Sequence, residues 1–108
     1  MEQEQKGLTK DEVLANYYGD EDVTALITLK ANTQNVEKMA AEIANNQDVE
    51  DVFLVTGDID IIIKGHFKNY ESCNNFVVNS IRQLEGVKET KTLMVVTTYK
   101  ERGEVKPP

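Results

Sequence analysis

The chain has 108 residues, the length of one domain, and its hydrophobic content of 40% is ordinary for a globular protein. Acidic residues outnumber basic ones by 19 to 12, and no two Lys or Arg residues are adjacent, which disfavours direct nucleic-acid binding. The one cysteine, Cys73, excludes an intramolecular disulfide, and no apolar run approaches the length of a membrane span. The polar N-terminus does not resemble a secretory signal peptide, so a cytoplasmic location is expected.

The first predicted element is a short helix over residues 10–18. The Thr9 hydroxyl can accept a hydrogen bond from the amide of Glu12, and the Glu12 carboxylate can accept one from the amide of Thr9, as in a capping box. Gly19 is placed to end this helix, because glycine readily adopts the left-handed conformation found after helix C-termini. Residues 24–31 are β-branched and alternating, which predicts a strand.

A second helix is expected next, capped by Asn32 or Thr33. Its apolar residues recur at the spacing i, i+3, i+4, i+7 and are Val36, Met39, Ala40 and Ile43. Asn45-Asn46 is a stop signal for this helix. Residues 49–56 then predict the second strand, and Gly57-Asp58 predicts a hairpin-type turn.

A third strand is predicted over residues 59–67, a helix over about 70–85 that ends at Gly86, and a fourth strand over 88–99. The apolar stripe of this helix is Tyr70, Cys73, Phe76 or Val77, Ile81 and Leu84. The order βαββαβ, with right-handed crossovers, places both main helices on one face of a four-stranded antiparallel sheet. We therefore expect an α+β, ferredoxin-like sandwich with a short extra N-terminal helix and a charged tail.

The alternation of the strands predicts a second apolar face. In the third strand Ile59, Ile61 and Ile63 point toward the helices, and in the fourth strand Leu93 and Val95 point away from Met94 and Val96. The opposite face of the third strand carries Asp60, Ile62, Lys64 and His66. Two helices cover one face of a sheet only, so we expect a second copy of the chain to pack on the other face in a sheet-to-sheet dimer. The alternative, that the N-terminal helix covers this face, is disfavoured because one short helix cannot cover four strands.

Two segments resemble a known family. Residues 52–63, Val-Phe-Leu-Val-Thr-Gly-Asp-Ile-Asp-Ile-Ile-Ile, resemble the strand–turn–strand signature of the effector (RAM) domain of Lrp/AsnC, or feast/famine, transcriptional regulators. Residues 84–92, Leu-Glu-Gly-Val-Lys-Glu-Thr-Lys-Thr, resemble the family's entry into the fourth strand, where a Thr-x-Thr pair follows Gly-Val. On this basis we expect an N-terminal extension over 1–23, a ligand-binding domain over 24–100 and a tail over 101–108.

The resemblance implies a non-enzymatic, amino-acid-binding regulatory domain that dimerises through its sheet and assembles into a higher oligomer. Carried over by position, the ligand-binding residues are Thr56, Gly57, Asp58, Ile59, Asp60, Thr90 and Thr92. Asp58 or Asp60 would bind the ligand's ammonium group, and backbone amides around Gly57 would bind its carboxylate. No cofactor and no metal ion is implied.

One departure from the family pattern concerns DNA binding. Typical members carry a helix-turn-helix domain, and only 23 residues precede the first predicted strand here. DNA binding is therefore not carried over, and the chain is expected to be a stand-alone effector domain that could join full-length relatives in mixed oligomers.

Other functions stay open at this level. An ACT-like regulatory module shares the βαββαβ order, and a pure assembly domain that modulates an enzyme or a full-length regulator needs no ligand. An enzyme would need a pocket with a His, Tyr or Asn constellation, and His66, the only histidine, has no nucleophile at a recognisable spacing. Asp58 and Asp60 can also be plain turn residues, and two carboxylates are a weak signal for a metal ion.

Overall fold

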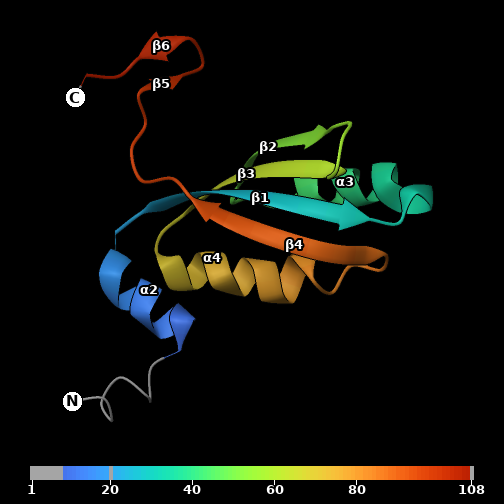
Figure 1. Cartoon of the computed structure of the whole chain (residues 1–108), viewed down its shortest axis with the longest axis horizontal. Helices are drawn as coiled ribbons and strands as arrows, with labels where there is room; N and C mark the ends of the chain where they lie inside the picture. The colour runs from blue at the N-terminus through green and yellow to red at the C-terminus, as the bar shows by residue number, and fades with distance from the viewer. Residues whose placement is uncertain (1–8, 20, 108) are drawn as a thin grey trace.

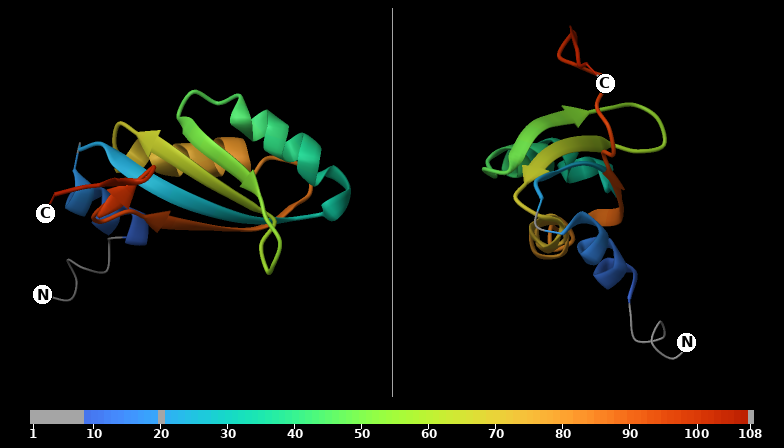
Figure 2. Two further views of the ribbon diagram at one scale, coloured as in Figure 1. Left: turned by 90° about the horizontal axis from the view of Figure 1, so that it is seen from above. Right: turned by 90° about the vertical axis from the view of Figure 1, so that its left-hand side faces the viewer.

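A computed structural model describes residues 9–19 and 21–107. Its body is a four-stranded antiparallel sheet in the order β2-β3-β1-β4. The strands are β1 (Val23–Ala31), β2 (Val49–Leu54), β3 (Ile61–Phe67) and β4 (Val87–Met94). Helices α3 (Val36–Ala44) and α4 (Tyr70–Phe76) pack on one face of this sheet (Figures 1 and 2), so the ferredoxin-like prediction is confirmed. Parts of the predicted extension and tail, residues 1–8, 20 and 108, lie outside the described residues.

The N-terminal helix α2 (Lys10–Tyr18) begins with the predicted capping box. The amide of Glu12 donates to Thr9 Oγ1 at 3.1 Å, and the amide of Thr9 donates to Glu12 Oε1 at 2.9 Å. Gly19 follows the helix with a φ of 62°, the left-handed conformation that glycine adopts without strain. Helix α2 contacts α4 and lies on the helical side of the molecule (Figure 1), so it leaves the other face of the sheet uncovered.

Helix α3 buries the stripe that its spacing predicts. Met39 and Ile43 are buried, while Val36 and Ala40 pack against the core from its margin. The capping residue is Asn32, whose side-chain oxygen accepts from the amide of Gln34 at 3.4 Å at the start of a 3-10 turn.

The helix predicted over residues 70–85 is shorter than expected, and its last part is not α-helical. Helix α4 ends at Phe76, and a π-helical turn, Val77–Ile81, continues it before the chain enters turns that end at Gly86, with a φ of 97°. The amide of Arg82 donates to the carbonyl of Val77 at 2.9 Å, which is the i→i+5 bond of a π turn. The extra residue per turn lets both Phe76 and Val77 face the core, where an α-helical spacing suggested one or the other.

The core lies between the sheet and the two helices. Its largest fully buried side chains are Ile27, Leu29, Ile61, Ile63, Phe67, Cys73 and Ile81. The rings of Phe67 and Phe76 lie 5.4 Å apart and tilted, which fixes α4 on β3. No helix in the described part of the chain is long and apolar enough to cross a membrane.

Three predicted strand limits are wrong, and each error has a local cause. Strand β2 ends at Leu54 and β3 begins at Ile61, because the amide of Val55 donates to the carbonyl of Asp60 and closes a turn before the ladder. Ile59 therefore lies in this turn, half-buried, and not on the core face of β3 as expected. Strand β4 ends at Met94, five residues before its predicted end, because β1 begins at Val23: the amide of Val95 still donates to the carbonyl of Thr24, and residues 96–98 leave the sheet.

The predicted tail contains a small hairpin that the sequence reading missed. Strands β5 (Lys100–Glu101) and β6 (Glu104–Val105) pair through a turn at Arg102 and Gly103, which have φ values of 51° and 81°. Two positive φ values in a two-residue loop are typical of a hairpin turn whose twist matches the strands. The hairpin projects from the body of the molecule (Figure 1), and Lys64 of β3 forms an ion pair with Glu101.

The face of the sheet opposite the helices, the open face, carries exposed apolar side chains as expected. Phe53 pairs with Ile62, and Leu93 pairs with Leu26 across neighbouring strands. Phe53 and Leu93 are each 54% exposed. The described part of the chain therefore leaves an apolar patch without a covering element on this face.

Candidate functional site

The turn between β2 and β3 is held against the end of β1 by Asp60. The amide of Asp60 donates to the carbonyl of Leu29, and its Oδ2 accepts from the amide of Ala31, both at 2.9 Å. The pairing of β1 with β4 shifts register between Lys30 and Ala31, where the Asp60 carboxylate satisfies this amide. Asp60 is half-buried and acts as the anchor that positions the turn.

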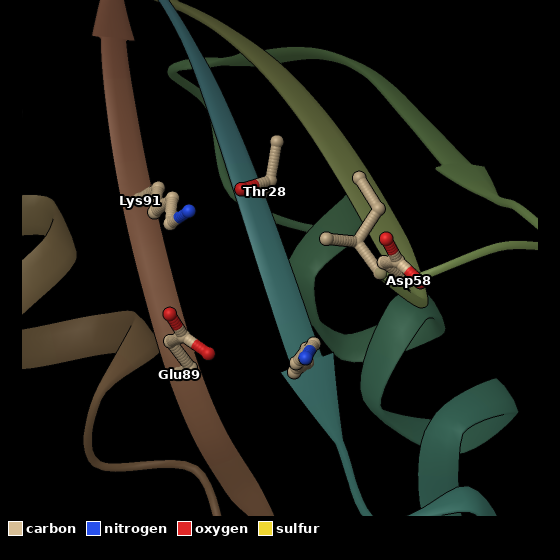
Figure 3. Close-up of a pocket in the computed structure, with 6 residues that line it drawn as sticks. Thr28, Asp58, Glu89 and Lys91 are labelled. Carbon is tan, nitrogen blue, oxygen red and sulfur yellow. The ribbon is translucent and has the colours of Figure 1, made fainter.

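A small hollow of about 190 Å³ lies beside this anchored turn on the open face. Its lining comes from β1, from the turn and from β4, and consists of Thr28, Lys30, Asp58, Ile59, Glu89 and Lys91. Figure 3 shows Thr28 on β1 and Glu89 and Lys91 on the neighbouring β4, with Asp58 on the other side of β1.

Strand register explains how these side chains meet. Thr28 is directly opposite Lys91, and Lys30 is directly opposite Glu89. Alternate residues of β1 point to opposite faces, and because Ile27 and Leu29 are buried against the helices, Thr28 and Lys30 point to the open face. The side chains opposite them on β4 share that face, which brings two ammonium and two carboxylate groups around one hollow.

The chemistry of this lining is that of a site for a small ion with both charges. Lys30 and Lys91 can donate to a carboxylate, and Asp58 and Glu89 can accept from an ammonium group. Ile59 is the one apolar residue of the lining. Asp58 is exposed, so its carboxylate is accessible to a ligand from solution.

The structure places only some of the predicted ligand-binding residues at the hollow. Asp58 and Ile59 line the hollow, and Asp60 anchors the turn beside it. Thr56 and Gly57 are exposed in the turn and do not line the hollow; Gly57 has a φ of 122°, which favours glycine there.

Thr90 and Thr92 lie on the other side of the sheet. They pair with Leu29 and Ile27, whose side chains are buried under the helices. Both threonines line a larger groove, of about 460 Å³, between β4, α2 and α4. Within one subunit the Thr-x-Thr pair is therefore separated from Asp58 by the sheet itself.

Four residues of the hollow were missed by sequence reasoning: Thr28, Lys30, Glu89 and Lys91. Their signal was the polar half of the alternation in the first and fourth strands. That alternation assigns each residue to a face, but it does not show which residues lie next to the turn, because this depends on cross-strand register.

The remaining reactive side chains do not form a catalytic set with the hollow. His66 lies at the other end of β1 and β3, with Nδ1 3.1 Å from Thr24 Oγ1 and Nε2 3.5 Å from Asp22 Oδ2. Cys73 is buried in the core, and this burial raises the pKa of its thiol to about 11. The described residues contain no group of three or more His, Cys, Asp or Glu side chains placed to hold a metal ion.

Comparison with known proteins gives one family. The model of the Lrp/AsnC ligand binding domain matches residues 24–105. An uncharacterized HTH-type transcriptional regulator of Pyrococcus abyssi is 35% identical over 86 residues, which cover 80% of this chain and 58% of the relative. The chain thus spans little more than half the length of this relative.

Solved structures share the fold. The crystal structure of a Thermus thermophilus protein has a TM-score of 0.69 and 29% identity, and the match covers 73% of this chain and 99% of that one. A transcriptional regulator from Neisseria meningitidis also has a TM-score of 0.69, at 19% identity, over 92% of this chain and 62% of that one.

Proposed function

This chain belongs to the Lrp/AsnC ligand-binding domain family, and on that premise we propose that it is a non-enzymatic regulatory domain that binds a free amino acid in the hollow beside Asp58. The observation that carries the proposal is the pairing of two cationic and two anionic side chains around a small hollow. A free amino acid is itself a zwitterion, so each of its charged groups finds the opposite charge there.

The groups of the hollow have separate roles in this proposal. The carboxylates of Asp58 and Glu89 bind the ammonium group of the ligand, and Lys30 and Lys91 bind its carboxylate. A volume of about 190 Å³ lies below the range of pockets for drug-sized ligands and suits a small metabolite. The regulator from Neisseria meningitidis, which shares this fold, was crystallised as a complex with L-Met, and this supports the ligand class.

The open face supports assembly of the domain. Its apolar residues Leu26, Phe53, Ile62 and Leu93 are the natural contact for a second copy in a sheet-to-sheet dimer. Thr90 and Thr92 face away from Asp58 in one subunit, so they contribute to the ligand site only where another subunit brings its turn to them. Their role stays a prediction that requires the higher oligomer.

The relatives support a proposal for the partners of the domain. The Pyrococcus relative is an HTH-type regulator, of which this chain spans 58%. We propose that the domain acts in the cytoplasm by assembling with Lrp/AsnC-type regulators that contain the same domain.

The test is the melting temperature of the protein against each of the twenty standard amino acids at millimolar concentration. A ligand at a hundredfold excess over its dissociation constant adds about 2.7 kcal/mol to the free energy of unfolding. Asp58→Asn should abolish the shift, whereas Asp48→Asn, the same change in another exposed turn, should keep it. If no amino acid raises the melting temperature, or if Asp58→Asn responds like the wild type, the proposal is wrong.

A pure assembly domain is the second candidate, and the exposed apolar side chains of the open face favour it. Leu93→Glu places a charge in this patch and should shift the sedimentation coefficient toward that of a monomer. Assembly without any amino-acid effect on the melting temperature would favour this second function over the first.

A further inference from the structure

A groove of about 460 Å³ beside β4 is not used by the proposed amino-acid site. The residues that line it come from β4, from α2, and from α4 with the turns that follow it. Apolar side chains at its floor include Leu14, Val77 and Met94. This groove differs from the hollow in place, because it lies on the helical side of the sheet and along its edge.

The wall contributed by β4 is the edge of the strand. Residues 90–94 all line the groove, although Lys91 and Leu93 point their side chains to the open face. Five consecutive residues line one groove only where the backbone itself is accessible. Among the described residues, β4 is the last strand of the sheet and pairs only with β1, so this part of the chain provides no strand partner for the backbone amides and carbonyls on its other side. Such an edge is a template for a further strand.

The charged side chains that line the groove are positive. The charged side chains that face it are those of Lys10 and Arg82, and no Asp or Glu whose side chain is described lines it. This is unexpected in a protein with a formal net charge of −7. A groove that concentrates one sign of charge attracts a partner of the opposite sign.

We propose that this groove binds an extended acidic peptide segment of another protein by strand addition to β4. The backbone of the segment pairs with residues 90–94, its carboxylates contact Lys10 and Arg82, and its apolar side chains contact Leu14 and Val77. Five strand residues extend about 14 Å from first to last, a length that fits a peptide strand better than a small anion. The proposal does not depend on the amino-acid site.

The probe is a fluorescein-labelled peptide, Glu-Val-Glu-Val-Glu-Val, and the readout is fluorescence anisotropy at low ionic strength. The wild-type protein should bind it with saturation and should bind the Lys-Val analogue at least about tenfold more weakly, the ratio that 1.4 kcal/mol represents. Lys10→Gln and Arg82→Gln should each weaken binding by about two- to fivefold, since a partly exposed charge contact contributes up to about 1 kcal/mol. Lys38→Gln is the matched control, because Lys38 lies on the exposed surface of α3 and outside the groove, and it should leave peptide binding unchanged.

Two methylated peptides separate strand addition from simple charge attraction. Alternate amides of a strand point to opposite edges, so the peptide uses either the amides of its valines or those of its glutamates to pair with β4. N-methylation of the amides that pair with β4 removes several backbone hydrogen bonds, each of about 0.5–1.5 kcal/mol, and should weaken binding at least about tenfold. N-methylation of the other set should leave the affinity within about threefold of that of the unmodified peptide.

Three results would overturn the proposal. Equal binding of both methylated peptides would mean that the charge alone attracts the peptide. No saturable binding of the acidic peptide would mean that the groove is not a strand site. A wild-type dimer that the Lys10→Glu, Arg82→Glu double variant converts to a monomer would mean that a second copy of this chain occupies the β4 edge. None of these results bears on the amino-acid site, which is tested by the melting temperature and Asp58→Asn.

Discussion

Replacing Asp60 with alanine should destabilise the protein and misplace the turn that carries Asp58. The Asp60 carboxylate accepts from the amide of Ala31 at 2.9 Å in a half-buried position. The substitution removes this acceptor, and a buried donor left unsatisfied costs about 1–3 kcal/mol. For a domain of about 100 residues, each kcal/mol lowers the melting temperature by roughly 4–8 °C.

Urea denaturation followed by circular dichroism measures this loss, and three variants make the test specific. Asp60→Ala should lower the free energy of unfolding by about 1–3 kcal/mol. Asp60→Asn keeps an oxygen acceptor and should recover most of the loss, while Asp58→Ala, at an exposed position, should stay within about 0.5 kcal/mol of the wild type. A fully stable Asp60→Ala variant would refute the anchoring role, and so would an Asp60→Asn variant as unstable as Asp60→Ala.

Three further predictions follow from the core and the C-terminal hairpin. Gly65→Ala should lower the free energy of unfolding by about 1–3 kcal/mol in the same assay, because its Cβ would lie 2.6 Å from the ring of the buried Phe67; unchanged stability would contradict this packing. Cys73, which is 1% exposed and whose pKa burial raises to about 11, should react with a thiol reagent at pH 8 only after denaturant is added; rapid reaction of the native protein would contradict its burial. The hydrogen bond from Lys64 lowers the pKa of Glu101. The contact between hairpin and sheet therefore contributes its full stability at pH values above the ordinary carboxyl pKa, and this contribution is lost as the pH falls through the lowered pKa of Glu101. An NMR pH titration of Glu101 should show this low midpoint, and Lys64→Met should return it toward the ordinary value; a midpoint that Lys64→Met does not move would contradict the contact.

The elements that local sequence rules describe were predictable. The capping box at Thr9 and Glu12 and the apolar stripe of α3 depend on residues a few positions apart, and the structure contains both. The four-stranded antiparallel sheet with both main helices on one face was predictable from the βαββαβ order of elements and the handedness of crossovers.

The elements that local rules did not describe depend on longer-range contacts. The apolar stripe of residues 70–85 continues past Phe76, so spacing alone predicts one α-helix, and the π turn arises because the core accommodates both Phe76 and Val77. The run of Thr and Val after Met94 has high strand propensity, but its contact with β1 ends with the hydrogen bond from the amide of Val95 to the carbonyl of Thr24, because β1 begins at Val23. Propensity without a partner strand does not make a strand.

The candidate site was predictable only where a local motif describes it. The glycine-containing turn identified Asp58 through a local motif. Lys30 and Glu89 come together only because β1 and β4 pair in one register, which no local motif reports. The separation of Thr90 from Asp58 likewise follows from the side of the sheet on which each residue lies.

The central claim is that a free amino acid binds beside Asp58, and an NMR titration of backbone amides tests it most directly. The uniformly labelled protein would be titrated with a mixture of the twenty amino acids and then with each one singly. The predicted result is a saturable set of shifts from one amino acid that centres on residues 28–30, 57–60 and 89–91 and is lost in Asp58→Asn. Saturable shifts centred elsewhere on the domain, or no shifts at millimolar concentrations, would contradict it.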